Sequence, residues 1–505
     1  MDFAINELIY FVLLLPVIFS VISATNLLPK DLLHWLNRIT ATCVAAAIGL
    51  LVVTFNPEQP YGDAYLYLDA LSVWMLLIVG TLYFAFAWTS KAYLDRDTNQ
   101  RYGYLRRFQR LEGRFYALSH MFVWIMFVVV TVNNLGLMWV AIEATTLVSA
   151  LLVAFKFTRT SLEATWKYVM VCTVGICLAL LGTILVYYIQ LTSVGTESPL
   201  NWLYLSQHVE NIDPAMAKFA FCFLFVGYGT KIGLAPMHAW LPDAHSEAPA
   251  LTSGLLSGSL CICAIYVLIR NIIILMPAIG VDFISGLCLF FGLFTVAAAV
   301  PFVLVQRDVK RMLAYSSMEN FGLMVAGLGL FVPVAAQAML LHMFNHALVK
   351  YSLFYTAGTI MEEFGTKNMM RIHGMMLQVP KTALFWILGI VGILGMPPFG
   401  VFFSKFYTIY GFFTADHPYL GILMLGLLAG MLIGILYHVM RMLGGHECRK
   451  CSGELFGIVD SVVLLALLVF SGVLSAGVNE IPVISKLLTT ASQIVLGGIS
   501  SCRIL

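Results

Sequence analysis

Long apolar runs follow one another along almost the whole chain, separated by short polar stretches. Runs such as 123–132 and 462–470 are nearly continuous and lack the alternation of polar and apolar residues that membrane β-barrels show. A helix needs about 20 mostly apolar residues to cross a bilayer. The pattern therefore predicts an all-α polytopic membrane protein with about 14 transmembrane helices. The predicted spans are 6–26, 38–55, 68–90, 115–132, 134–156, 166–190, 215–240, 250–275, 281–305, 313–331, 334–360, 381–413, 418–442 and 455–477.

Composition supports the same class. Of the 505 residues, 60% are hydrophobic and only 11% are charged. Soluble domains carry about 25% charged residues, and disordered chains combine low hydrophobicity with high charge, so both classes are excluded. The net charge of +2 gives no reason to expect a nucleic-acid partner. The tail 479–505 is mixed in polarity and is expected at the surface.

The basic residues predict an orientation. If the N-terminus lies outside, most of the 28 Lys and Arg residues fall in cytoplasmic loops, including the basic stretch 91–114. Only Lys218, Arg270, Lys486 and Arg503 then lie outside. Because cytoplasmic loops carry the excess of positive charge, we predict an external N-terminus. The basic stretch is better explained by topology than by binding of anionic lipid or an acidic partner.

Two predicted spans contain residues that break helices. The segment 229–242 has two glycines and two prolines around Lys231, and the segment 392–400 (GILGMPPFG) precedes Lys405. Proline removes a backbone donor and clashes with the preceding turn. Paired interrupted helices are typical of inverted-repeat transporters with a site at mid-depth. Helix packing alone would explain one such segment, but two segments beside lysines favour an ion site.

A small set of ionisable residues falls inside the predicted spans. A charge at the bilayer centre costs about 2.5–3.5 kcal/mol, so each of these residues is a candidate functional residue. A spacing of four places His342, His346 and Lys350 on one helical face. The complete set predicted to translocate protons is Glu143, Lys231, His342, His346, Lys350 and Lys405.

These residue types suit proton transfer. Burial favours a neutral lysine and a nearby carboxylate favours a charged one, so movement of the carboxylate switches the proton affinity. Histidine titrates near neutrality and relays protons between such sites. One alternative is a static Glu143–Lys231 pair that fixes helix packing, although buried pairs often stabilise no more than apolar ones. For His342 and His346 the alternative is a hydrogen bond between helices.

Polar residues also follow the first helix break. His238, Asp243, His245 and Glu247 lie within or just after it. The last three have the chemistry of metal ligands, but a position at the cytoplasmic mouth favours proton access or capping of the broken ends. We therefore predict possible relay or access roles for these four residues.

No cofactor or metal is predicted on this chain. The one CxxC motif, Cys448 and Cys451 beside His446, has no second pair and is better explained as a reduced polar loop. The sequence has no haem-attachment motif, no Gly-rich nucleotide fingerprint and no P-loop. The other cysteines lie mostly in apolar runs and are expected to pack as small hydrophobic residues.

Three segments carry a resemblance to a known family. They are 231–249 (KIGLAPMHAWLPDAHSEAP), 308–317 (DVKRMLAYSS) and 397–405. With them, the chain resembles the antiporter-like subunits of respiratory complex I, of cation/proton antiporter complexes and of membrane-bound nickel–iron hydrogenases. The segments 142–153 and 243–249 are most similar to component F of hydrogenase-4-type complexes. The resemblance covers roughly the third to the thirteenth span.

The resemblance implies a domain organisation. Helices four to eight and nine to thirteen would form two inverted five-helix repeats, with helices seven and twelve broken. The chain would divide into three N-terminal helices with a basic cytoplasmic loop (1–114), a first repeat (115–275), a second repeat (281–442), and a polar loop, last helix and tail (443–505).

The resemblance also implies roles for the candidate residues. By motif, they correspond to a polar axis along the membrane midplane: Glu143 in the fifth helix, Lys231 in the broken seventh, His342, His346 and Lys350 in the eleventh, and Lys405 in the broken twelfth. One departure concerns the eighth helix, where many members carry a Lys or His. Here the segment 251–266 has no Lys, His or carboxylate, so Thr252, Ser257 or Ser259 would have to support transfer there.

The resulting prediction is a proton-translocating, antiporter-like membrane subunit of a multisubunit energy-converting complex of the hydrogenase-4 or complex I type. The chain would lie in the plasma membrane of a bacterial or archaeal cell and carry no redox chemistry itself. Its expected partners are other membrane and soluble subunits, the lipid bilayer, and protons or Na⁺. Three alternatives stay open: a sodium/proton antiporter subunit, the proton-channel subunit of a CO₂/bicarbonate uptake complex, and a scaffold with an interrupted path.

Overall fold

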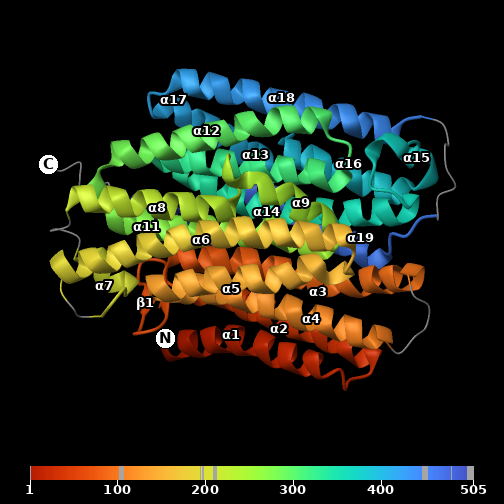
Figure 1. The fold of residues 1–505 in the computed structure, drawn as a ribbon, viewed down its shortest axis with the longest axis horizontal. Coiled ribbons are helices and arrows are strands. Elements are labelled where there is room, and N and C mark those ends of the chain that lie inside the picture. Colours follow the sequence, from red (N-terminus) through yellow and green to blue (C-terminus); the bar gives the residue numbers. More distant parts are fainter. Residues whose placement is uncertain are drawn as a thin grey trace.

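The computed structural model describes residues 2–101, 107–193, 195, 198–208, 213–445, 453–478 and 480–497. Almost all of this part is helical, and the helices run side by side along the horizontal direction of Figure 1. Within the described ranges, eleven segments are long and apolar enough to cross a membrane. The predicted class, an all-α polytopic membrane protein, is confirmed. The count of fourteen and the inverted repeats stay predictions, and Cys448 and Cys451 lie outside the described residues.

The N-terminal helices form the lower layer of Figure 1. α1 packs against α4, and α2 packs against α3, while a short antiparallel pair of strands closes the connection between α2 and α3. The connection between α3 and α4 falls within the basic stretch 91–114, of which residues 102–106 lie outside the described ranges. The elements of this layer are α1 (Asp2–Thr25), α2 (Lys30–Thr54), β1 (Tyr61–Gly62), β2 (Tyr67–Leu68), α3 (Ala70–Arg101) and α4 (Arg107–Thr131).

The next part of the chain contains the first broken helix. Its two halves are α8 and α9, separated by a short turn, and α6 packs along both of them. The elements are α5 (Leu135–Val153), η1 (Ala154–Lys156), α6 (Arg159–Ser193), α7 (Trp202–Gln207), α8 (Pro214–Ile232), η2 (Met237–Ala239), α9 (Trp240–Glu247), α10 (Ala250–Leu255), η3 (Leu256–Leu260) and α11 (Cys261–Ile279). The element η3 is a π-helical turn between α10 and α11.

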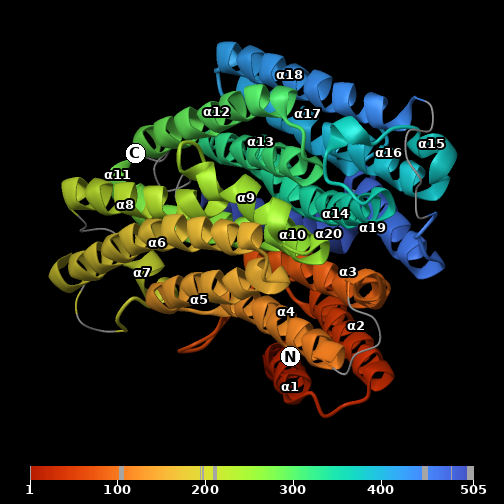
Figure 2. The same cartoon turned by 45° about the vertical axis from the view of Figure 1, so that its right-hand side comes forward.

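The third part contains the second broken helix, formed by α16 and α17. The long helix α14 is buried along most of its length and contacts α3, α10, α13 and α17, so it lies inside the bundle (Figure 2). The elements are α12 (Val281–Val305), α13 (Val309–Gly329), α14 (Pro333–Phe364), η4 (Met369–Arg371), α15 (Met375–Gln378), α16 (Pro380–Leu394), α17 (Gly400–Thr414) and α18 (Pro418–Leu443).

The C-terminal part folds back onto the bundle. It consists of α19 (Ile458–Ala476) and α20 (Pro482–Leu496). α20 contacts α3 and α14, and it buries Leu487, Leu488 and Val495 on that side. One face of this amphipathic helix is therefore covered by α3 and α14, while Pro482 and Lys486 are exposed, as expected of a tail at the surface.

Both helix breaks have the same local cause. α8 is followed by Gly233 with φ +90°, and α16 is followed by Gly395 with φ +80°. A left-handed residue at this position favours glycine, and it satisfies carbonyls of the last helical turn. Proline follows within three residues in both cases and cannot continue the helix. The structure thus contains both breaks where the sequence predicts them.

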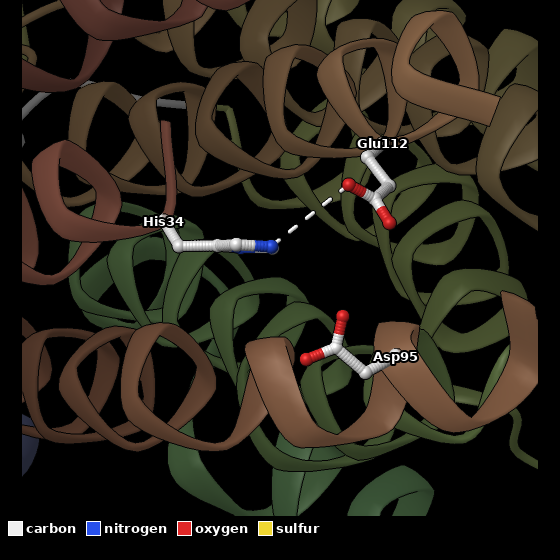
Figure 3. A group of neighbouring side chains, drawn as sticks. All are labelled: His34, Asp95 and Glu112. Atoms are coloured by element: carbon white, nitrogen blue, oxygen red, sulfur yellow. Dashed lines mark ion pairs between the residues drawn. The ribbon is translucent and has the colours of Figure 1, made fainter. Parts of the chain in front are cut away.

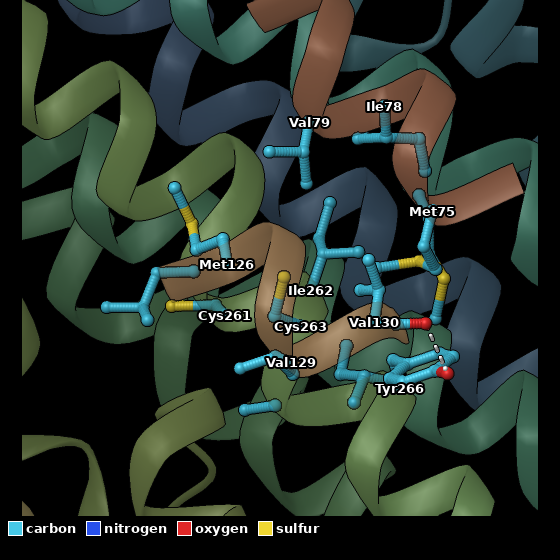
Figure 4. Packing of buried hydrophobic residues seen from close by; sticks show 14 of the residues in the cluster. Met75, Ile78, Val79, Met126, Val129, Val130, Cys261, Ile262, Cys263 and Tyr266 are labelled. Atoms are coloured by element: carbon cyan, nitrogen blue, oxygen red, sulfur yellow. Dashed lines mark hydrogen bonds between the residues drawn. The ribbon is translucent and has the colours of Figure 1, made fainter. Parts of the chain in front are cut away.

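An apolar layer joins the N-terminal helices to the helix formed by α10, η3 and α11. Figure 4 shows Met75 and Val79 of α3, Met126 of α4 and Ile262 of α11 packed together. All four side chains are essentially buried. At the edge of this layer, the Tyr266 hydroxyl donates a hydrogen bond of 3.0 Å to the carbonyl of Val130.

Candidate functional site

The first lysine group is built around Lys231 at the end of α8. This side chain is fully buried, two residues before the helix break. Its Nζ donates to Thr146 Oγ1 at 2.8 Å and to the Tyr168 hydroxyl at 3.0 Å. The ammonium also lies 5.2 Å from the centre of the Tyr168 ring. The C-terminal end of a helix favours a cation, so the break itself contributes to holding Lys231.

Glu143 of α5 joins this group through a hydroxyl. Thr146, one turn further along α5, donates to Glu143 Oε2 at 3.0 Å while it accepts from Lys231. Thr173 of α6 donates to the other carboxylate oxygen at 3.2 Å. Glu143 and Lys231 therefore share one hydroxyl and do not form a direct ion pair in the described structure. The direct static pair considered from the sequence is not the observed arrangement.

The second lysine group is built around Lys405 of α17. Its Nζ lies 2.7 Å from Oε1 of Glu319 in α13, and this carboxylate is only 2% exposed. The lysine stem passes the end of α16, where a Cβ added to Gly395 would lie 3.1 Å from Lys405 Cδ. Here the lysine and carboxylate form a direct, buried ion pair.

A hydrogen-bonded chain continues from this pair to His342. Asn320 donates to Glu319 Oε2 at 2.9 Å and to the Ser316 carbonyl at 2.6 Å. Its amide oxygen must therefore accept from His342 Nε2, at 2.9 Å. His342 Nδ1, 2.8 Å from Ser404 Oγ, is then the basic nitrogen. The ring can take up a proton at Nδ1 without breaking its bond to Asn320.

His346 and Lys350 occupy the next two turns of α14 and are fully buried. The centres of the His342 and His346 rings are 6.3 Å apart, and His346 Nε2 lies 3.5 Å from Ser257 Oγ. Lys350 Nζ donates to the carbonyl of Leu313 at 2.8 Å. The predicted common face of these three residues therefore points into the bundle.

Ser257 lies in the π-helical turn η3, in the helix that lacks a Lys or His. Its hydroxyl is 2.7 Å from Ser317 Oγ of α13 in addition to its contact with His346. π-helical turns often occur at functional sites because they disturb the regular helical hydrogen bonding. Ser257 thus belongs to the second lysine group. In the described part of the chain, no side-chain hydrogen bond connects it to Lys231.

The residues after the first break are mostly held by ion pairs. Asp243 contacts Arg311 at 2.6 Å and Lys167 at 3.2 Å, while Glu247 contacts Lys367 at 2.6 Å. These pairs connect α9 to α6, to the start of α13 and to the segment after α14. Asp243 and Glu247 therefore fix this end of the broken helix and are not arranged as metal ligands.

The two histidines of this segment differ in environment. His238 lies in η2, is half-buried, and its ring centre is 6.1 Å from that of Phe302. His245 in α9 is fully buried, stacks on Phe354 at 5.0 Å, and neither ring nitrogen has a hydrogen-bond partner in the described structure. His238 Nδ1 also lacks a hydrogen-bond partner there, so each of these two histidines has a buried ring nitrogen that can gain one.

Lys367, in the loop after α14, shows how this network holds its charges. Partial burial lowers the pKa of Lys367, but its hydrogen bond to Glu247 and the charge of Asp308 outweigh this effect and raise the pKa above its usual value. Lys367 therefore stays positively charged across the physiological pH range and holds the two carboxylates in place.

Several residues of the site were missed from the sequence. Glu319 and Asn320 lie in the predicted span 313–331, and the available signal was an intramembrane carboxylate in an apolar stretch. Thr146 gave no signal, since its role depends on the position of Lys231. Arg270, which the charge count assigned to the external side, was not predicted as a buried ion-pair residue. It is fully buried in α11 and forms a bidentate pair with Asp69 at 2.6 and 2.7 Å.

Comparison with known proteins identifies the family. Residues 132–432 match the transmembrane family described as NADH:quinone oxidoreductase/Mrp antiporter. The match covers more than half of the chain and includes every lysine, glutamate and histidine of the two groups. The chain belongs to this antiporter family.

Individual relatives agree with this assignment. The chain is 32% identical over 399 residues to a protein named Hydrogenase-4 component F homolog from Methylacidiphilum infernorum, covering 79% of this chain and 82% of that relative. It is 27% identical to Hydrogenase-4 component B of Escherichia coli, covering 81% of this chain and 59% of that relative.

Solved structures share the fold of this antiporter family member. A chain of the Mrp complex from Dietzia sp. aligns with a TM-score of 0.83 at 17% identity, covering 100% of this chain and 99% of that chain. A chain of respiratory complex I from Thermus thermophilus aligns with a TM-score of 0.81 at 20% identity, covering 97% and 99%. The whole chain therefore has the fold of these membrane subunits.

Proposed function

We propose that this chain is a proton-translocating, antiporter-like subunit of a multisubunit energy-converting complex of the hydrogenase-4 or complex I type. The observation that carries the proposal is the pair of lysine groups. Each lysine lies beside a helix break inside the bundle, and each is coupled to a carboxylate, one directly and one through a hydroxyl. The names of the hydrogenase-4 relatives support the type of complex.

In the first group, the proton would be held at Lys231 or at Glu143. Thr146 connects the two because its hydroxyl accepts from one and donates to the other. When the carboxylate approaches, the ammonium form is favoured, and when it withdraws, the proton is released. The Tyr168 hydroxyl and ring keep the lysine side chain in place during this exchange.

In the second group, the proton would move between Lys405, Glu319 and His342. The direct ion pair holds the charged lysine, and Asn320 couples the carboxylate to the imidazole. His342 Nδ1 is the atom that gains or loses a proton. His346 and Ser257 extend this group toward η3, and we assign Ser257 the transfer step in the helix that lacks a Lys or His.

The chain's surroundings follow from the same proposal. We infer that it lies in the plasma membrane of a bacterial or archaeal cell with its N-terminus outside. Its partners would be other membrane and soluble subunits that carry the driving reaction. We assign no cofactor, metal or redox chemistry to the proton path of this chain.

The proposal is tested by reconstituting the complex in lipid vesicles and following internal pH with a fluorescent dye. Glu143→Gln and Lys231→Ala should each abolish most proton movement while the complex still assembles. If both variants assemble and move protons as the wild type does, the relay is wrong and the chain acts as a scaffold.

The same vesicles distinguish the remaining alternatives. Proton movement that requires Na⁺ on the opposite side would indicate a sodium/proton antiporter subunit. Co-purified subunits that hydrate CO₂ would indicate a carbon-uptake complex. Proton movement that needs neither, and depends on a co-purified redox subunit, supports the energy-converting complex.

A further inference from the structure

A separate cluster of ionisable side chains lies in the N-terminal helices α2, α3 and α4, which carry no residue of the two lysine groups. It combines Lys30 and His34 at the start of α2, Asp95 near the end of α3 and Glu112 near the start of α4. The ligand atoms of His34, Asp95 and Glu112 all lie within 4.8 Å of one another. Figure 3 shows the imidazole pointing at Glu112, with the Asp95 carboxylate on the other side of the same space.

Lys30 holds the two carboxylates of this cluster together. Its Nζ is 2.7 Å from Asp95 Oδ1 and 2.9 Å from Glu112 Oε1. The Lys30 and Asp95 side chains are 32% and 37% exposed, whereas Glu112 is 3% exposed. The lysine can therefore move out into solvent, but Glu112 stays inside the helix bundle.

Both nitrogens of the His34 ring have a defined place in this cluster. Nδ1 lies 2.7 Å from the Tyr116 hydroxyl, which also lies 3.2 Å from Ser90 Oγ. This contact orients the ring so that Nε2 faces the carboxylates. In the neutral tautomer whose proton is on Nδ1, Nε2 presents a lone pair.

This lone pair faces a carboxylate. His34 Nε2 lies 3.8 Å from Glu112 Oε2, makes no hydrogen bond in the described structure, and belongs to a side chain that is only 2% exposed. A lone pair and a carboxylate repel each other unless a cation lies between them. Lys30 does not fill this role, because it contacts the other oxygen of Glu112. A proton on Nε2 or a metal ion at this position would remove the repulsion.

We propose that His34, Asp95 and Glu112 form a binding site for a divalent transition-metal ion of the Zn²⁺ type, with Lys30 as a competing cation. One imidazole nitrogen and two carboxylates form a ligand set that suits Zn²⁺ and leaves a fourth position for water. The bond from Nδ1 to Tyr116 orients the ring, as the second hydrogen bond of a metal-binding histidine does. Exchange of Lys30 for the metal would keep the carboxylates neutralised.

A metal at this position would cross-link α2, α3 and α4 at the end of the bundle. The site shares no residue with the two lysine groups, so it does not depend on the proposed proton path. Its test therefore measures binding and unfolding and needs no transport activity.

The experiment is a Zn²⁺ titration of the purified full-length protein, followed by calorimetry and by thermal unfolding with and without a chelator. The wild type should bind one Zn²⁺ and unfold at a higher temperature with the metal. His34→Gln should weaken binding at least about tenfold, since one ligand is lost. Lys30→Gln should strengthen it by about tenfold, because the competing charge is removed.

The Lys30 variant separates a metal site from a structural ion-pair network. In a structural network, removal of Lys30 lowers stability and leaves Zn²⁺ without effect, a result that would overturn the proposal. Lys30→Gln keeps all three ligands, so it remains informative if His34→Gln fails to fold. As a matched control, His417→Gln changes an exposed histidine between α17 and α18 and should leave binding unchanged. Equal Zn²⁺ binding by the wild type and His34→Gln would also overturn the proposed site. If neither the wild type nor Lys30→Gln binds Zn²⁺, the proposal is wrong and Nε2 carries only a proton.

Discussion

The two lysine groups use similar parts in different arrangements. Lys405 contacts Glu319 directly at 2.7 Å, whereas Lys231 reaches Glu143 only through the hydroxyl of Thr146. Glu319 is almost completely buried, while Glu143 is half-buried beside the exposed face of α5. The comparison shows one lysine with its carboxylate engaged and one with its carboxylate held one hydroxyl away. These are the two states that a lysine-based proton switch requires.

The two lysines have similar surroundings, so the two groups differ in where the carboxylate lies and not in where the lysine lies. Lys231 is carried by the half-helix that ends at its break, and the Lys405 stem packs over Gly395 at the end of the other half-helix. Both lysines are thus placed beside the end of a half-helix, which favours a cation. Thr146 lies three residues after Glu143 and places its hydroxyl between that carboxylate and Lys231. The residue three positions after Glu319 is Gly322, which has no hydroxyl to place between Glu319 and Lys405.

The largest effect is expected from Glu319→Gln. It leaves Lys405 without its carboxylate in a buried position, and breaking one side of a buried pair costs about 3 kcal/mol or more. We expect the free energy of unfolding to fall by about 3 kcal/mol and proton movement in vesicles to be lost. In the control variant Glu319→Gln/Lys405→Met, stability should recover while transport stays lost. A stable, active single variant would contradict the direct pair.

The next comparison replaces each lysine by Met. Lys405→Met leaves buried Glu319 unpaired, so we expect lower thermal stability and lost transport. Lys231→Met should also abolish transport, but stability should stay the same or increase, since it removes a buried ammonium that has no direct carboxylate partner. Thermal unfolding of both variants measures the difference. An equal loss of stability in both would mean that Glu143 pairs with Lys231 more tightly than the structure shows.

A smaller effect is expected from Thr146→Val, which removes the shared hydroxyl but keeps the shape of the side chain. A hydrogen bond to a charged group contributes about 1.5–3 kcal/mol, so proton movement should fall by about tenfold. Thr145→Val is the matched control, because the Thr145 hydroxyl bonds only within its own helix, to the Ile142 carbonyl. If both variants transport equally well, Thr146 does not couple Glu143 to Lys231.

The smallest effect is expected from Ser257→Ala in η3. The serine makes neutral hydrogen bonds, which contribute about 0.5–1.5 kcal/mol, so we expect a loss of transport of roughly threefold. Ser259→Ala serves as the control, since its hydroxyl bonds to the Leu255 carbonyl of its own helix. Unchanged transport in Ser257→Ala would remove this residue from the path.

Much of the site was predictable because it depends on local sequence. Apolar runs of sufficient length predict spanning helices, and a glycine followed by proline predicts each break. Buried lysines and histidines are recognisable since charge inside a membrane is costly. Arg270 shows the limit of this reasoning. The charge count predicts only a side of the membrane and gave no sign that Arg270 lies inside the bundle, where Asp69, directly before α3, neutralises it.

The sequence by itself determined the membrane class, the two breaks and the chemical types of the residues beside them. Only the tertiary structure decided which carboxylate each lysine contacts, since Glu319 and Lys405 are 86 residues apart in the chain. One hydroxyl, that of Thr146, distinguishes Lys231, which reaches its carboxylate indirectly, from Lys405, which contacts its carboxylate directly. Such distances are set by the packing of whole helices against one another, and no local pattern of residues records them.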